Sequence, residues 1–248
     1  MKKCFLVMVT CFAWSVSANV AELIQQGDVY DKQLKPEAAL KSYLPAEKLD
    51  PNNGALLVKI ARQYIFRMDD LPSKSAKLES AKTALSYAER AVKVAPTESD
   101  SHLSVAICLG KMTPMLGIRE QVEASRKIKT NAERAVKLNP SDDYAWHMLG
   151  RWHQALADMS GMTRTIAQLV YGNLPAASFE EAEKCFKKAI ALNPKRLIHY
   201  IELGRTYALM GKSSEAKAML QKGLAMPNLE KDDAESKTRG RETLAKLG

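Results

Sequence analysis

The sequence predicts an all-α protein built from repeated pairs of amphipathic helices. Ala, Leu, Lys, Glu and Met dominate its 248 residues, and period-two runs of β-branched and aromatic residues are absent. Four amphipathic segments each stop just before a proline: Pro51, Pro96, Pro140 and Pro194. Proline cannot continue the helical hydrogen-bond ladder, so each segment must end there. The prolines are 45, 44 and 54 residues apart, a spacing typical of stacked helical repeats.

The first 18 residues have the layout of a cleavable secretory signal. Two lysines follow Met1, largely apolar residues extend from Cys4 to Val16, and Val16-Ser17-Ala18 supplies small groups before Asn19. A helix over the apolar run would cover ~20 Å, which is short of the ~30 Å hydrocarbon core. We therefore expect a signal peptide at 1–18, a repeat domain at 19–248, and export to the bacterial periplasm or secretion. A retained anchor and a buried first helix are the alternatives.

Each predicted repeat pairs a first helix that carries a small residue with a second helix that carries alanines. A small residue lets the two helices approach closely, and large residues on either side fill the gap. The small residues are Gly27, Ala61, Ala106, Gly150 and Gly204, and the facing residues of the second helices are Ala39, Ala84, Ile128, Ala182 and Ala216. The middle three units contain extra residues, which predict longer helices or an added turn inside each unit.

This pattern resembles the tetratricopeptide repeat. The resemblance implies a right-handed superhelical solenoid of about five helix pairs. Because terminal repeats need a cap that covers apolar surface, we also expect a C-terminal helix from about Asp232 to Leu247. Its start is acidic, helix-forming residues fill most of its length, and Leu244 and Leu247 are predicted to face inward.

The stretch at 139–161 concentrates two tryptophans and two histidines, which suggests either a metal or cofactor site or a packing surface. His147 and His153 are six positions apart, unlike the i, i+4 pair that binds zinc on a helix. We expect packing, with Trp146 and His153 at large positions of a repeat helix. Asp142 and its neighbour are expected to cap that helix. No catalytic or phosphate-binding motif is found, so the sequence predicts neither an enzyme nor a cofactor.

Residues 150–182 carry an insertion that generic repeats lack, and this segment resembles the regulator of microtubule dynamics family. The matching residues are Gly150, Trp152, Ala157, Arg164, Ala167, Tyr171, Pro175 and the run Ser178–Ala182. The resemblance covers about residues 78–247. It implies a helical scaffold that binds partners and is cytoplasmic or membrane-associated, near microtubules, mitochondria or organelle membranes. An export signal would separate the domain from microtubules, so tubulin binding is expected only for a cytosolic protein.

When each repeat is numbered from its aligned start, at 20, 54, 99, 143 and 197, position 9 of the first helix is Asp28, Arg62, Ile107, Arg151 and Arg205. In the resembling family this position faces the concave groove, which places Arg62, Arg151 and Arg205 there, although Ile107 interrupts the row. Arginine grips a carboxylate with two parallel hydrogen bonds, so we expect the groove to bind an acidic peptide or a terminal carboxylate. His147 and Gln154 are predicted to lie beside Arg151. In the alternative interpretation these arginines pair with nearby Glu or Asp and only stabilise the stack.

Net charge is +9, but most lysines fall on the polar faces of second helices. An acidic partner or an anionic membrane surface would use the remaining charge. Nucleic acid is not expected, because no basic stripe is interleaved with exposed aromatics.

A second functional hypothesis is an apolar-ligand or lipid carrier, with a pocket under the 155–175 insertion. Methionines make such a surface adaptable. Its predicted lining is Met159, Met162, Ile166 and Leu169. Cys108 and Cys185 are expected to be buried, and to be oxidised only if the fold brings them together.

Overall fold

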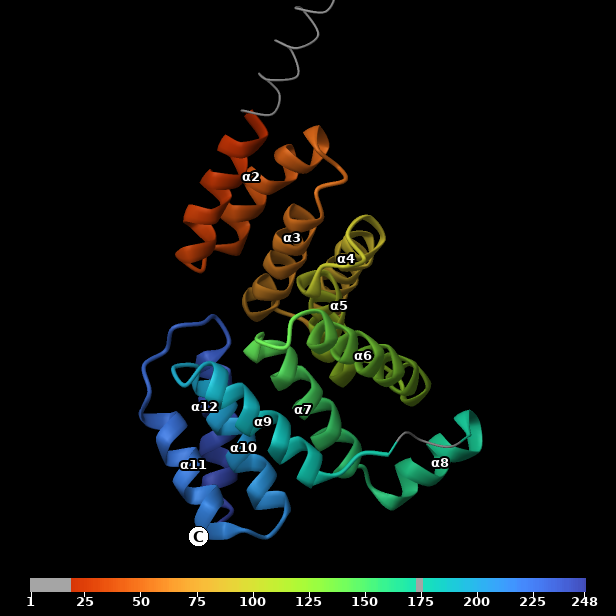
Figure 1. Ribbon diagram of the computed structural model, residues 1–248, viewed down its shortest axis with the longest axis vertical. Coiled ribbons are helices and arrows are strands. Elements are labelled where there is room, and N and C mark those ends of the chain that lie inside the picture. The colour runs from red at the N-terminus through yellow and green to blue at the C-terminus, as the bar shows by residue number, and fades with distance from the viewer. Residues whose placement is uncertain (1–18, 173–175) are drawn as a thin grey trace, which may run out of the picture. The chain divides into compact units, whose positions relative to one another are not determined.

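In the computed structural model, residues 19–172 and 176–248 are described, and all of their regular structure is helical (Figure 1). The predicted all-α, tetratricopeptide-like fold is confirmed. The proposed signal at 1–18 lies outside the described residues. The chain divides into two compact units, and the division falls within α5 (Ser99–Met112), between Ser104 and Val105.

The N-terminal unit is formed by two successive helix pairs. Residues 19–32 are helical and pair with α2 (Pro36–Leu49), and α3 (Gly54–Phe66) pairs with α4 (Lys74–Val94), after the short turn η1 (Arg67–Asp70). Tyr43 is fully buried and occupies the space over Gly27, where any Cβ would collide with its ring. The small residue of the first repeat therefore allows the close helix contact that the sequence predicted.

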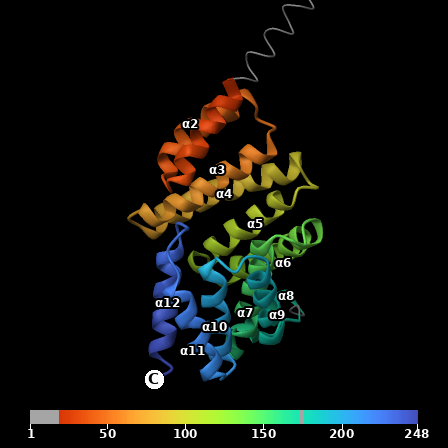
Figure 2. The same ribbon diagram turned by 60° about the vertical axis from the view of Figure 1, so that its left-hand side comes forward.

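The C-terminal unit contains two further pairs and a capping helix. Its helices are α6 (Ile118–Leu138), α7 (Asp143–Ala157), α8 (Gly161–Tyr171), α9 (Phe179–Leu192), α10 (Leu197–Leu209), α11 (Ser213–Ala225) and α12 (Asp233–Ala245). α7 packs on α9, and α10 packs on α11. Figure 2 shows α12 beside α10 and α11, both of which it contacts.

Close helix approach at glycine also builds this unit. A Cβ on Gly150 would lie 2.9 Å from Cε1 of Phe186, and one on Gly204 would lie 2.7 Å from Cγ of Leu220. Phe186 and Leu220 are both fully buried. Each large side chain of a second helix therefore rests directly on the backbone of the first helix.

The capping helix is also confirmed, at Asp233–Ala245 rather than from Asp232 to Leu247. Leu244 and Leu247 pack against the buried cluster that contains Ile201. Gly240 contributes a close contact, because its Cβ would lie 2.8 Å from Cδ1 of Ile201. The cap therefore uses the same glycine contact as the repeats.

The extra residues of the middle units are found where the sequence predicted longer helices or added turns. α4 and α6 are each 21 residues long. Short 3-10 turns follow α3 and α5, at η1 and at η2 (Thr113–Met115). The third insertion forms α8, which contacts α6 and stands to the right in Figure 1.

The helices before the four prolines end as predicted, and an unexpected contact closes three of the turns. The sixth residue after the proline donates a side-chain hydrogen bond to the proline carbonyl. The pairs are His102 Nε2 to Pro96 O at 3.0 Å, Trp146 Nε1 to Pro140 O at 2.9 Å, and Tyr200 Oη to Pro194 O at 3.1 Å. Each ring thus fastens a first helix to the turn that precedes it.

Trp146 and His153 are both partly exposed. The hydrogen bond to Pro140 corrects the packing position predicted for Trp146, whereas the ring of His153 packs edge-on against Trp152, with ring centroids 4.9 Å apart. The residues of that stretch that fill the interior are His147 and Trp152, at 2% and 4% exposure. Trp146 instead lies at the turn, because its ring N–H reaches the carbonyl of Pro140.

We predict that Trp152→Ala destabilises the protein more than Trp146→Ala. Trp152 is buried, its Nε1 donates to Ser125 Oγ at 3.0 Å, and Lys129 Nζ lies 5.6 Å from its ring centroid. Its loss should lower the free energy of unfolding by about 3–5 kcal/mol, whereas loss of the partly exposed Trp146 should cost about 1–2 kcal/mol. Urea denaturation of both variants measures the difference, and a reversed order would contradict the assignment.

Candidate functional site

The predicted binding residues are divided between the two units. Arg62 belongs to the N-terminal unit, where its guanidinium pairs with Asp31 and lies 6.0 Å from the ring centroid of Phe66. Its side chain is 47% exposed. Asp28, at position 9 of the first helix of the preceding repeat, accepts hydrogen bonds from Tyr43 and Lys59. In this unit the position-9 residues are therefore engaged in ion pairs with neighbouring helices.

Arg151 and Arg205 meet on one buried carboxylate in the C-terminal unit. Glu202 of α10 is fully buried, and its Oε1 lies 2.5 Å from Nη1 of Arg151 on α7. Its Oε2 accepts a hydrogen bond from Nη1 of Arg205 at 2.7 Å. Burial alone would raise the pKa of Glu202, but the nearby arginines outweigh it and hold that pKa below the ordinary value. Glu202 is therefore ionised at neutral pH.

A third arginine joins this cluster from the capping helix. Nη2 of Arg239 lies 3.5 Å from Oε1 of Glu202, and its Nη1 donates to Glu235 at 2.6 Å. Glu202 thus ties α7, α10 and α12 together through charge. We call Glu202, Arg151, Arg205 and Arg239 the arginine cluster.

The side chain of Gln154 also makes its hydrogen bonds inside the C-terminal unit. Its Nε2 donates to the backbone oxygen of Glu202 at 3.2 Å and to Thr206 Oγ1 at 2.9 Å. Gln154 is only 5% exposed, so it holds α7 against α10 below the arginine cluster.

The arginine cluster has more positive than negative charge at its surface. Among the residues that the structure describes, Glu202 is the one acid paired with Arg151 and Arg205. The charge of Arg239 is balanced separately by Glu235. The side chains of Arg151 and Arg205 are 36% and 28% exposed. Two ordered, partly exposed guanidiniums therefore share one negative charge.

His147 lies one helical turn before Arg151 and contacts a second buried histidine. Its Nδ1 is 3.0 Å from Nδ1 of His199, and His199 Nε2 lies 2.8 Å from Asp143 Oδ2. Burial alone would raise the pKa of Asp143, but the His199 hydrogen bond and the charge of Arg196 hold it below the ordinary value. The ionised carboxylate accepts, so His199 donates to it from Nε2.

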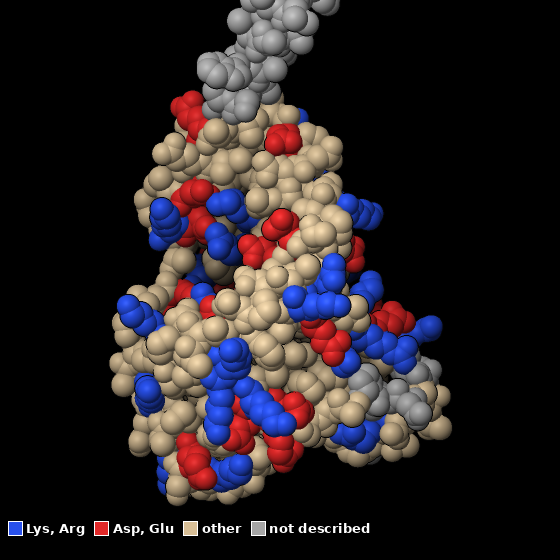
Figure 3. Space-filling view, viewed as in Figure 1, with Lys and Arg blue, Asp and Glu red and all other residues tan. Residues whose placement is uncertain are grey.

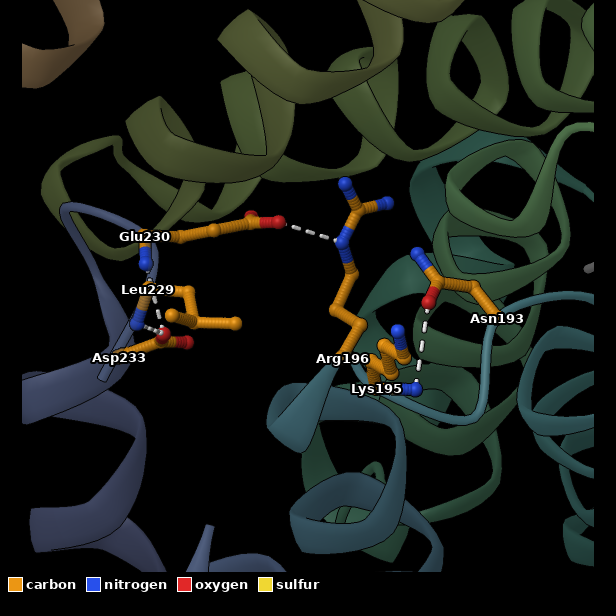
Figure 4. Close-up of a pocket in the computed structure, with 6 residues that line it drawn as sticks. All are labelled: Asn193, Lys195, Arg196, Leu229, Glu230 and Asp233. Carbon is orange, nitrogen blue, oxygen red and sulfur yellow. Dashed lines mark hydrogen bonds and ion pairs between the residues drawn. The ribbon is translucent and has the colours of Figure 1, made fainter. Parts of the chain in front are cut away.

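Arg196 continues this network toward the capping helix. Its Nη1 pairs with Asp143 at 2.5 Å and its Nε donates to Glu230 at 2.6 Å. Figure 4 shows Arg196 and Glu230 reaching toward each other across a cavity of about 70 Å³. Drug-sized ligands need roughly 300–1,000 Å³, so this cavity does not accommodate one. The ion pair instead fastens the turn before α10 to the segment before α12.

The predicted apolar pocket is described only in part. Met159 is half-buried and Leu169 is 81% exposed, while the side chains of Met162 and Ile166 lie outside the described set. Ser160 caps α8, and Arg164 Nη2 donates to the backbone oxygen of Leu156 at 2.8 Å. The carrier hypothesis remains a prediction.

Cys108 and Cys185 are buried and are not joined by a disulfide, and burial raises the pKa of the Cys185 thiol to about 12. Over the described parts of the chain, no helix is long and apolar enough to cross a bilayer. The same residues contain no group of three or more His, Cys, Asp and Glu placed to hold a metal. Figure 3 shows basic and acidic side chains interspersed over the face in view.

Sequence reasoning missed the partners of the predicted arginines. Glu202 precedes Arg205 by three positions on a helix, so a local ion pair could have been expected there. Arg239 and Glu235 are four positions apart on one helix, so their ion pair could also have been expected. The contacts of Arg239 with Glu202 and of His199 with His147 gave no such signal, because these partners lie on other helices.

We predict that Glu202→Ala lowers the free energy of unfolding by about 3–5 kcal/mol, because it leaves partly buried arginines without their counter-charge. The triple variant Glu202→Gln, Arg151→Gln and Arg205→Gln should lose less, since it removes the paired charges together. Urea denaturation compares them. A Glu202→Ala protein within about 0.5 kcal/mol of wild type would contradict this role.

Comparison with solved structures supports the fold. The chain is similar to a thermophilic TPR protein of Thermus thermophilus, with a TM-score of 0.64, 17% identity, and coverage of 91% of this chain and 99% of the other. It also resembles PilF of Pseudomonas aeruginosa, with a TM-score of 0.57, 13% identity, and coverage of 94% and 90%.

Comparison with curated sequences identifies the family. Regulator of microtubule dynamics protein 1 of Mus musculus is 28% identical over 237 residues, 93% of this chain and 76% of the relative. The Rattus norvegicus protein is 30% identical over 165 residues, 66% of this chain and 53% of the relative. The family model for regulator of microtubule dynamics protein 1-3 matches residues 22–248. The chain therefore belongs to the regulator of microtubule dynamics family.

Proposed function

We propose that this chain is a non-enzymatic scaffold that binds a protein or peptide partner in a concave groove lined by its first helices. In the C-terminal unit, Arg151 and Arg205 would hold an acidic side chain or a terminal carboxylate of the partner. The tetratricopeptide-like fold and the membership of a family of regulators support this proposal.

The observation that carries the proposal is the shared carboxylate of Glu202. It orders Arg151 and Arg205 through one Nη1 atom each, and other N–H groups of each guanidinium remain for a partner. Because the side chains are already fixed, a partner carboxylate would gain charge-assisted hydrogen bonds at little further cost in conformational entropy. The buried carboxylate of Glu202 would thus hold both arginines in place for a carboxylate of the partner.

Arg62 would act separately, on the surface of the N-terminal unit, where it is ordered by Asp31. We also retain the proposal that residues 1–18 direct export. In an exported protein the partner would be a protein of that compartment, whereas microtubules, named in the description of the relatives, would be candidates in the cytosol.

The test uses a hexa-aspartate peptide with a free C-terminal carboxylate, titrated into the full-length chain by isothermal titration calorimetry. A hexa-asparagine peptide is the neutral control. We predict that hexa-aspartate binds and that added salt weakens the binding. The Glu202→Gln, Arg151→Gln, Arg205→Gln variant should bind at least about tenfold more weakly, because the charge-assisted hydrogen bonds are lost.

Lys188→Gln is the matched control, since it removes the same single unit of net charge from an exposed position of α9. It should leave binding unchanged. Equal binding by the triple variant and wild type would overturn the proposal. Binding to vesicles of phosphatidylcholine and phosphatidylserine without binding of the peptide would also overturn it, in favour of an anionic membrane surface.

A further inference from the structure

When both rings are neutral, the partners of His147 and His199 fix which ring nitrogen carries each hydrogen in their buried contact. His199 donates from Nε2 to Asp143, so in a neutral ring its Nδ1 is a bare acceptor. Nδ1 of His147 must then carry the single hydrogen of the 3.0 Å contact. The neutral pair therefore has one possible arrangement of its protons.

This pair can take up one further proton without breaking its contact. The added proton enters at Nε2 of His147, and the hydrogen between the two Nδ1 atoms can then reside on either ring. When it moves to His199, the positive charge lies next to the ionised carboxylate of Asp143. A second added proton would place two N–H groups face to face, so the pair takes up only one.

The surroundings of the pair are mainly cationic. The charged side chains that shift the pKa of the two rings are Asp142, Asp143 and Arg151 at α7, Arg196 before α10, and Arg239 on α12. Tyr144 stacks on His147, and α9 supplies the uncharged ring of Phe186. Burial lowers the pKa of both histidines, and for His147 the positive charges of His199 and the three arginines lower it further.

Arg151 connects this pair to the surface assigned above. Its positive charge, one helical turn after His147, lowers the pKa of His147, and its guanidinium also forms the ion pair with Glu202. We propose, on the basis of that function, that His147 and His199 are the proton sensor of the Arg151–Arg205 surface. A carboxylate of an acidic peptide that binds there drives uptake of one proton by the pair, so the peptide binds more tightly as the pH falls.

The direction of the pH dependence of peptide binding follows from thermodynamic linkage. A bound carboxylate offsets the charge of Arg151 and so raises the pKa of the histidine pair. The bound state then carries more protons than the free state, and binding must strengthen with falling pH. If the bound peptide raises the pKa of the pair by about one unit, the Kd falls about tenfold over the full titration. That titration extends from above the ordinary histidine pKa of about 6.5 to below the lowered pKa of the pair in the free protein.

The experiment repeats the hexa-aspartate titration between about pH 7.5 and about pH 5, because the pKa of His147 in the free protein lies well below the ordinary value, while most carboxylates of the peptide stay ionised over this range. Buffers of different ionisation enthalpy report proton uptake, after subtraction of the uptake by free peptide. We predict net uptake by wild type. In His147→Asn, whose amide can still donate to His199, binding at about pH 7.5 should persist and the uptake should fall, because Nε2 of His147, where the added proton enters, is lost.

Nuclear magnetic resonance of wild type gives a second measure that needs no variant. Saturating peptide should raise the apparent pKa of His147 and His199. His153 is the internal control: it lies on the same helix, and burial lowers its pKa too, but its charged neighbours are Glu181, Lys129 and Glu133. Its pKa should not move, and His153→Asn should retain the proton uptake.

The outcomes separate the two proposals. Absence of peptide binding at every pH would overturn the proposed function. Binding that depends on Arg151 and Arg205 but brings no proton uptake and no shift at His147 or His199 would overturn the proton link alone. An equal shift at all three histidines would also overturn it, since the effect would then be general.

Discussion

The burial of one ionised carboxylate, that of Glu202, constrains how three helices of the C-terminal unit pack together. A carboxylate taken out of water costs several kcal/mol unless cations and hydrogen bonds replace its hydration. Glu202 obtains these cations from α7, from its own helix and from α12. Three helices must therefore keep a fixed spacing around it. The apolar contacts bring the helices together, and the carboxylate sets which polar groups can lie between them.

The apolar framework could be predicted because its signals are local. A proline marks each helix end within one turn, and a glycine marks a close helix contact, as at Gly150 and Gly204. Both signals act through the backbone, so they need no knowledge of distant residues. The capping helix could be predicted because a terminal repeat needs a cover for its apolar surface, and an acidic start and two leucines at helical spacing marked that helix in the sequence.

The polar contacts could be predicted only in part, because their partners lie in other repeats. The repeat position selected Arg151 and Arg205, but it could not reveal that both form ion pairs with Glu202. The error at Trp146 has a related cause. An aromatic ring was assigned to the interior, whereas its N–H group finds a carbonyl at the turn. Helical spacing predicts the face of the helix on which a residue lies, but it does not predict the hydrogen-bond partner of that residue.

These polar groups show how one surface can serve both stability and binding. A guanidinium has donors on more than one edge, so the edge that satisfies Glu202 leaves another edge for solvent or a partner. His147 and His199 are buried in the same unit, and the single hydrogen of their contact lies between the two Nδ1 atoms. A negative charge that binds at Arg151 would offset the charge of that guanidinium, and the pair would respond by gaining a proton. The buried network would thus couple binding at the surface to pH.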